Sequence, residues 1–256
     1  MRIALYQMSI AWEDKAANMA KVEERLKEAA AQQTDILLLP EMSFTGFSMN
    51  TDVTGETGEE TVENVKSLAV KYGVAMGFGW VKDCGEKAEN HYTIVDKSGV
   101  CLSDYVKLHP FSFAGEDRKF RGGERLTAFE LDGIPCSNFI CYDLRFPEIF
   151  QIASKSAHVI IVPANWPAKR SSHWKTLLQA RAIENQVYIL AVNCVGQMDG
   201  LYYSGDSCIV DPDSRVLRMI SDEEGLIIYD LVDDVEQYRE RFPVKKDRRE
   251  ELYSIM

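Results

Sequence analysis

The chain has 256 residues, of which 46% are apolar and 27% are charged, and its formal net charge is −11 at pH 7. This composition is typical of a globular protein, and the length suits one large α/β domain or two small ones. The acidic balance argues against a nucleic-acid binder, which needs a basic face to neutralise phosphates.

The cysteine pattern and the apolar runs indicate where the protein works. The six cysteines are irregularly spaced and form no CxxC pair, which removes the usual zinc and thioredoxin motifs. No apolar run approaches the roughly 20 residues that a membrane-spanning helix needs. The first residues also lack the pattern of a signal peptide. We therefore expect reduced thiols, a soluble cytoplasmic protein that uses neither nucleic acid nor membrane, and no metal or cofactor.

Short apolar runs alternate with helical patterns in the first half of the chain, which is typical of a layered α/β fold. The strands expected here cover residues 2–7, 36–39, 74–80 and 91–96, and the helices cover residues 18–32 and 61–72. The first helix carries Met19, Val22 and Leu26 on one face. The strand at 36–39 should stop at Pro40, because proline cannot donate to a sheet. The polar stretch KDCGEKAEN is expected to be a turn.

The second half of the chain continues the same alternation. Its expected strands cover residues 102–106, 127–131, 134–140, 159–162, 187–193, 207–210 and 226–231, and its helices cover residues 146–155 and 172–185. The tail from residue 232 onward is charged, and Pro243 interrupts it. No repeat, linker or low-complexity segment is present, so we expect one domain over residues 1–256.

Reactive residue types follow four of the expected strands. They are Glu41, Lys107, Cys141 and the pair Asn165 and Trp166. The carboxyl ends of strands in an open α/β sheet form the crevice where ligands bind, so these side chains should converge. Each has an ordinary explanation when taken alone: a helix start for the glutamate, a surface position for the lysine and a core position for the cysteine. Together they predict a reactive site.

A cysteine nucleophile would explain this combination. The thiolate is the reactive form, and a free cysteine is mostly thiol at neutral pH, so Cys141 needs a nearby base or cation. Glu41 can supply the base and Lys107 the cation. His109 follows Lys107 by two residues and faces the same way along an extended chain. A Cys141–His109 pair therefore stays open as an alternative.

Three segments resemble the signature motifs of the nitrilase, or carbon–nitrogen hydrolase, superfamily. They read LLLPEMSFTGFSM, DYVKLHPF and FICYDLRFPEIF. The resemblance continues through VPANWPAKRSSHWKTLLQARAIENQVYILAVNCVG and YSGDSCIVDP to YRERFP, so it covers essentially the whole chain. It implies a four-layer α-β-β-α sandwich and a homodimer that pairs through a helical face.

The resemblance also implies roles for individual residues. Glu41 would be the general base, Lys107 the cationic stabiliser and Cys141 the nucleophile. A second glutamate shortly after the lysine would hold the lysine and help to position the substrate. Glu116 is our choice for it, and Glu124 is the competitor.

The longest similarity is to the omega-amidases, which hydrolyse the terminal amide of α-keto acid amides such as 2-oxoglutaramate. CYDLRFPE, NWPAKRSSHW, ARAIENQVY and YRERFP all look like the bacterial branch of that group. The expected reaction is therefore hydrolysis of a small dicarboxylic monoamide, with water, through a Cys141 thioester. The alternatives are an aliphatic amidase, an N-carbamoylase or a nitrilase, and, from a different class, a catalytically silent scaffold protein.

A pocket for such a substrate needs an oxyanion donor, a cation and apolar walls. The resemblance implies that the backbone N–H of Tyr142 joins Lys107 at the oxyanion. For the substrate carboxylate we favour Arg170; further candidates are Lys169, Arg118, Arg121 and Arg145. The expected wall residues are Phe44, Phe47, Tyr142 and Trp166, with Asn165 beside them and His173 and Trp174 at the mouth.

Two of the arginines have a structural explanation. Arg145 stands two residues before Pro147 and near Glu148, which favours a structural ion pair. Arg181 and Glu184 are three residues apart on one expected helix, which favours an intrahelical pair.

Overall fold

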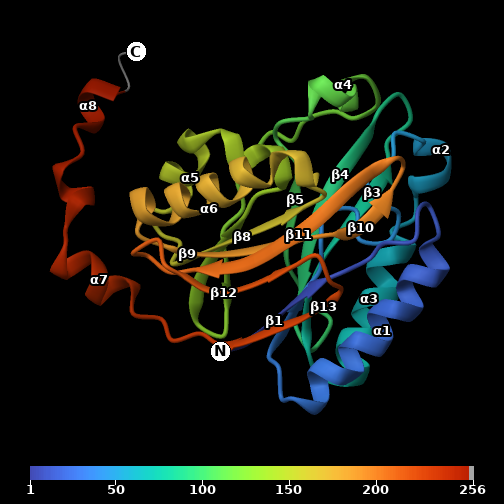
Figure 1. The fold of residues 1–256 in the computed structure, drawn as a ribbon, viewed down its shortest axis with the longest axis horizontal. Coiled ribbons are helices and arrows are strands. Elements are labelled where there is room, and N and C mark those ends of the chain that lie inside the picture. The colour runs from blue at the N-terminus through green and yellow to red at the C-terminus, as the bar shows by residue number, and fades with distance from the viewer. Residues whose placement is uncertain (254–256) are drawn as a thin grey trace.

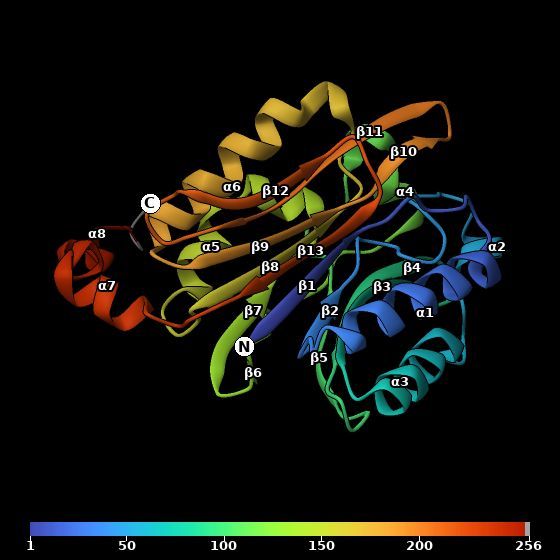
Figure 2. The same cartoon turned by 60° about the horizontal axis from the view of Figure 1, so that its bottom comes forward.

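The computed structural model describes residues 1–253 as a stack of four layers (Figure 1, Figure 2). Two β-sheets lie face to face in the middle, and helices cover the outer face of each. This is the α-β-β-α sandwich that the sequence predicts.

The first sheet has six strands in the order β13-β1-β2-β3-β4-β5. Their bounds are β13 (Gly225–Asp230), β1 (Arg2–Gln7), β2 (Ile36–Leu38), β3 (Ala75–Asp83), β4 (Ala88–Val95) and β5 (Cys101–Val106). β1, β2 and β3 run parallel, whereas β4 and β5 extend the sheet as antiparallel hairpins. As a result β2 and β5 end at the same edge.

The second sheet has seven strands, in the order β10-β11-β9-β8-β7-β6, with β12 also paired to β11. Their bounds are β6 (Phe129–Leu131), β7 (Ile134–Asn138), β8 (Val159–Ala164), β9 (Tyr188–Asn193), β10 (Val195–Met198), β11 (Leu201–Val210) and β12 (Val216–Ser221). β7, β8 and β9 are parallel, so the segments that follow β7 and β8 emerge together.

Figure 2 shows helices α1 (Lys15–Ala31) and α3 (Glu60–Tyr72) against the first sheet, and α5 (Pro147–Ala153) and α6 (Ser171–Asn185) against the second. The remaining helices are shorter: α2 (Thr51–Thr54), α4 (Glu116–Lys119), α7 (Val235–Arg241) and α8 (Glu250–Tyr253). Four single turns complete the list: η1 (Ser112–Ala114), η2 (Cys141–Arg145), η3 (Ala168–Arg170) and η4 (Val244–Asp247). No helix within residues 1–253 is long and apolar enough to cross a membrane.

Alternation along β1 explains the layering. Ile3 and Leu5 are buried in the cluster between the sheets, whereas Ala4 and Tyr6 are buried with α1 and α3. Successive residues of a strand point to opposite faces, so this strand is apolar on both sides. The sheets therefore bury both faces, and their strand ends are left to form the site.

The structure corrects several expected boundaries. The polar stretch at 82–90 is not a loop throughout, because β3 and β4 pair as far as Asp83 and Ala88 and leave a short turn. The strand at 134–140 ends at Asn138 instead. The short strands β10 and β12 and the helix α7 were not predicted.

Candidate active site

Cys141 stands at a sharp turn just after β7. It opens η2 with a φ of 47°, in the left-handed region that a residue other than glycine seldom adopts. The buried carboxylate of Asp143 accepts a hydrogen bond from Ile140 N at 3.0 Å and another from the Tyr105 hydroxyl at 2.8 Å. These bonds hold the strained turn, so the position of the thiol is set by β7 on one side and β5 on the other.

A buried cluster of three charges lies beside this turn. The Lys107 ammonium is 2.8 Å from Glu41 Oε1, 2.8 Å from Glu116 Oε2 and 3.0 Å from Glu116 Oε1. The side chains of Lys107, Glu41 and Glu116 are each at most 1% exposed. Glu124 is exposed, so it is Glu116 that lies against the lysine. A buried charge needs such pairing, because burial alone disfavours it.

Two asparagines tie Glu41 into this cluster. Asn165 follows β8, and its backbone N–H donates to Glu41 Oε2 at 2.9 Å, while its side-chain amide donates to the backbone oxygen of Glu41. Asn90, on β4, donates to Glu41 Oε1 at 2.9 Å. The carboxylate is thus held by groups from both sheets.

The charges decide which group can give or take a proton. Burial would lower the pKa of Lys107, but Glu116 and Glu41 outweigh it and raise that pKa above its ordinary value, so the ammonium keeps its charge. Burial and the Glu41 carboxylate raise the pKa of the Cys141 thiol, and Lys107 opposes them. To act as a nucleophile, the Cys141 thiol would therefore need a base, and the charged lysine cannot be that base.

His109 is occupied elsewhere. Its Nδ1 lies 2.7 Å from Asp143 Oδ1, and its ring stacks on Phe146 with the centroids 3.8 Å apart. The imidazole therefore forms part of the support for the turn, and this arrangement disfavours a papain-like pair with Cys141.

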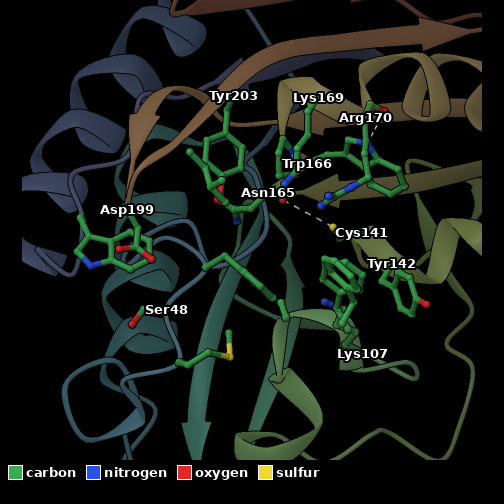
Figure 3. Close-up of a pocket in the computed structure, with 18 of the residues that line it drawn as sticks. Ser48, Lys107, Cys141, Tyr142, Asn165, Trp166, Lys169, Arg170, Asp199 and Tyr203 are labelled. Carbon is green, nitrogen blue, oxygen red and sulfur yellow. Dashed lines mark hydrogen bonds between the residues drawn. The ribbon is translucent and has the colours of Figure 1, made fainter.

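A cavity of about 410 Å³ opens over the thiol (Figure 3). The predicted residues that line it are Phe47, Lys107, Cys141, Tyr142, Asn165, Trp166 and Arg170. The Cys141 thiol lies 4.0 Å from the backbone oxygen of Asn165. Aromatic side chains supply a large part of the lining, and Lys107, Cys141 and Asn165 add polar groups to it, as in many small-molecule sites.

Three expected pocket residues lie elsewhere. Phe44 is buried in the core, with its ring 6.3 Å from that of Phe78, because the chain turns between it and Phe47. Trp174 is fully buried and donates to the backbone oxygen of Asp206. His173 does not line the cavity, although its Nδ1 is 3.3 Å from Arg145 Nη2.

The cations around the cavity also differ from expectation. Arg145 lines the cavity and lies over the Trp166 ring at 4.8 Å, so the expected ion pair with Glu148 is wrong. Arg170 lies over the Phe111 ring at 5.4 Å. Within residues 1–253, all arginine–carboxylate ion pairs involve other arginines, so neither Arg145 nor Arg170 has a carboxylate within salt-bridge distance.

The other candidate cations are placed as follows. Lys169 also lines the cavity, whereas Arg118 and Arg121 do not, and Arg121 pairs with Glu89 at 2.8 Å. Arg181 pairs with Glu184 at 2.9 Å, as their spacing predicts. Burial and the positive charge of Arg170 together lower the pKa of Arg145.

Sequence reasoning missed Asn90 and misread Arg145. Asn90 fell in the stretch expected to be a turn, and alternation along a longer β4 would have been the only signal for it. Arg145 was interpreted as the partner of Glu148, although its place four residues after Cys141 was available as a signal for a position in the cavity.

Comparisons with known proteins agree with this geometry. The carbon-nitrogen hydrolase family model matches residues 2–240. The 2-oxoglutaramate amidase of Bacillus subtilis is 36% identical, covering 98% of each chain, and the omega-amidase YafV of Yersinia enterocolitica is 32% identical, covering 96% of each. A mutant amidase from Nesterenkonia sp. AN1, with acrylamide added at its active-site cysteine, matches with a TM-score of 0.88 at 27% identity, covering 99% of this chain and 98% of that one. The chain belongs to the carbon–nitrogen hydrolase family of the nitrilase superfamily, and it is a hydrolase of carbon–nitrogen bonds other than peptide bonds.

Proposed function

We propose that this hydrolase cleaves the terminal amide of small dicarboxylic monoamides, of the 2-oxoglutaramate or succinamate type, to the acid and ammonia. The observation that carries the proposal is the pair Arg145 and Arg170, two cavity arginines without a carboxylate partner among the described residues. A substrate carboxylate would supply that partner, and two arginine forks can hold it with paired hydrogen bonds. The names of the two similar relatives support the same substrate class.

The reaction would proceed by acyl transfer to water. Glu41 takes the proton from the Cys141 thiol, and the thiolate attacks the amide carbonyl. The Lys107 ammonium and the backbone N–H of Tyr142 stabilise the oxyanion, and pre-oriented donors of this kind contribute about 3–4 kcal/mol each. Glu41 then gives its proton to the departing ammonia, which leaves a thioester on Cys141.

The second half of the reaction releases the acid. Glu41 takes a proton from water, and the resulting hydroxide attacks the thioester carbonyl. The thiolate leaves and regains the proton from Glu41, so the enzyme returns to its starting form. Glu116 keeps Lys107 in place throughout, through the two contacts at 2.8 and 3.0 Å.

We also propose that the protein is a single-domain homodimer in the cytoplasm. Ile152 on α5 and Ile183 on α6 are 54% and 48% exposed, and apolar residues on adjacent helices suit a helical interface. Sedimentation equilibrium should give twice the chain mass. A monomer at micromolar concentration would remove the dimer from the proposal.

A substrate comparison tests the function. Ammonia release from 2-oxoglutaramate and succinamate should exceed release from propionamide, a nitrile or an N-carbamoyl amino acid, and Cys141→Ala should abolish it. If the dicarboxylic monoamides are the poorest substrates, the proposed substrate class is wrong. Retained turnover in Cys141→Ala would overturn the nucleophile.

The anchoring role is tested separately. Arg145→Met and Arg170→Met should raise KM for succinamate far more than for propionamide, because only succinamate carries a carboxylate. Arg218→Met is the matched control, since Arg218 lies on β12 over the Tyr229 ring, outside the cavity. Equal effects on both substrates would remove these arginines from the anchor.

A further inference from the structure

Asn90 bridges the two carboxylates of the buried cluster. Its Nδ2 lies 2.9 Å from Glu41 Oε1 and 3.1 Å from Glu116 Oε1, and the Lys107 ammonium contacts the same two oxygens. The backbone oxygen of Asn90 also accepts the backbone N–H of Lys107 at 2.9 Å. One residue therefore holds all three charged groups, and it has no charge of its own.

The orientation of the Asn90 amide follows from its neighbours. If the amide were turned over, Oδ1 would face two carboxylate oxygens, which accept and cannot donate when ionised. Nδ2 must therefore point to the carboxylates, and Oδ1 is left buried without a partner among residues 1–253. A buried acceptor without a partner is unfavourable for the folded state, so the fold alone does not explain an asparagine at this position.

The cluster has one more negative charge than positive when both carboxylates are ionised. Burial and Glu41 raise the pKa of Glu116 in spite of Lys107, so the surroundings other than Asn90 oppose the ionisation of both carboxylates at once. The other titratable groups around it are Cys141 and Tyr203, which both line the cavity, and the buried Cys194. On the opposite face of β4, His91 lies between Glu89 and Asp104.

We propose that Asn90 is a positioning residue that keeps Glu41 and Glu116 ionised together, so that Glu41 is free to take the Cys141 proton. Its two N–H groups stabilise both carboxylates without adding a charge to the cluster. The proton then moves from the Cys141 sulfur to the Glu41 carboxylate, while Glu116 stays ionised and paired with the Lys107 ammonium. This inference rests on the proposed function, because it assumes that Glu41 is the base for Cys141.

The pH profile of kcat/KM tests the role of Asn90. In Asn90→Ala each carboxylate loses one donor, so the acidic limb should move to higher pH by about one unit. kcat should fall roughly 10- to 100-fold with little change in KM, because base catalysis is impaired and substrate contacts remain. Asn90→Asp adds a negative charge at neutral pH. It should be nearly inactive there and regain activity in acid, where the introduced carboxyl is protonated and donates.

Asn138→Ala is the matched control. Asn138 is a fully buried strand residue on β7 whose Oδ1 accepts from Ser103 and Thr127, away from the carboxylates. The Asn138→Ala variant should have a lower melting temperature and the same pH profile of kcat/KM as the wild type. Asn90→Ser serves as a second variant if Asn90→Asp does not fold, and it should shift the acidic limb less than Asn90→Ala does.

The outcomes separate two failures. If Cys141→Ala abolishes turnover but the acidic limb of Asn90→Ala matches that of the wild type, only the role of Asn90 is overturned. An equal shift in Asn138→Ala would also overturn it, since loss of stability would then be the cause. If Cys141→Ala retains turnover, the proposed mechanism through a Cys141 thioester fails, whatever the pH profile of Asn90→Ala.

Discussion

Gly79→Ala should lower kcat/KM strongly in a protein that still folds, because the added methyl group would displace the backbone that carries Glu41. A methyl group at Gly79 would overlap the backbone nitrogen of Met42 and come within 2.8 Å of the carbonyl carbon of Glu41. Ordinary carbon contacts lie at about 3.5–4.0 Å, so β3 and the Glu41 segment would have to separate by about 1 Å. A shift of about 1 Å in catalytic geometry costs about 100-fold in rate.

Gly77→Ala on the same strand is the control. Its methyl group would come within 2.7–2.9 Å of the side-chain ends of Leu38, Ile94 and Tyr92, so its three nearest contacts are side chains and not the Glu41 backbone. Both variants overpack a core, which typically costs 1–3 kcal/mol, so both should lower the melting temperature.

The assay compares kcat/KM for ammonia release with the melting temperature of each variant. We expect about a 100-fold loss in Gly79→Ala and less than about tenfold in Gly77→Ala, at similar melting temperatures. Wild-type kcat/KM in a folded Gly79→Ala would refute the reasoning. Equal losses in the two variants would do the same, since overpacking alone would then explain the effect.

Three further predictions concern titration and the support of the turn. Burial and Glu41 raise the pKa of Cys141, and Lys107 lowers it, so Lys107→Met should slow the alkylation of Cys141 by iodoacetamide near neutral pH. Mass spectrometry can measure the alkylation rate. Faster labelling in Lys107→Met would contradict the prediction. Burial and neighbouring arginines lower the pKa of Lys245 from 10.5 to about 7 in the folded protein. The unfolded chain therefore binds this proton first as the pH falls from 10.5 to 7, and the contribution to the stability of the folded protein that is present above pH 10.5 is lost over that range. Lys245→Met should therefore raise the melting temperature relative to the wild type most at pH 7 and below, and the gap should close as the pH rises. His109→Gln should lower the melting temperature and retain most of kcat, and complete loss in a folded variant would restore the histidine as a candidate base.

Three residues of the site were predictable because one rule covers their positions, whereas Glu116 was expected only from the family resemblance. Glu41, Lys107 and Cys141 each follow an apolar run that reads as a strand, and the ends of such strands converge. The site could therefore be assembled from positions along the chain without knowledge of contacts. The single-domain organisation stays a prediction.

The rest depended on contacts that no local pattern encodes. Asn90 meets Glu41 across 49 residues of sequence, inside a polar stretch that resembles a turn. Arg145 stands near Glu148 in the chain, but its guanidinium stacks on Trp166, which follows a different strand. Phe44 and Phe47 are three residues apart, and only the turn between them sends one to the core and the other to the cavity.

The site is divided between the two sheets, and this division determines how it responds to change. Glu41 and Lys107 follow strands of the first sheet, and Cys141 follows a strand of the second. Polar bonds join the halves near the thiol, from Asn165 to Glu41 at 2.9 Å and from Tyr105 to Asp143 at 2.8 Å. The turn at Cys141 is strained and the charges beside it are buried, and both are unfavourable without stabilising contacts. Each half of the site therefore depends on contacts from the other sheet. A change that loosens the packing between the sheets should therefore reduce turnover before it unfolds the protein.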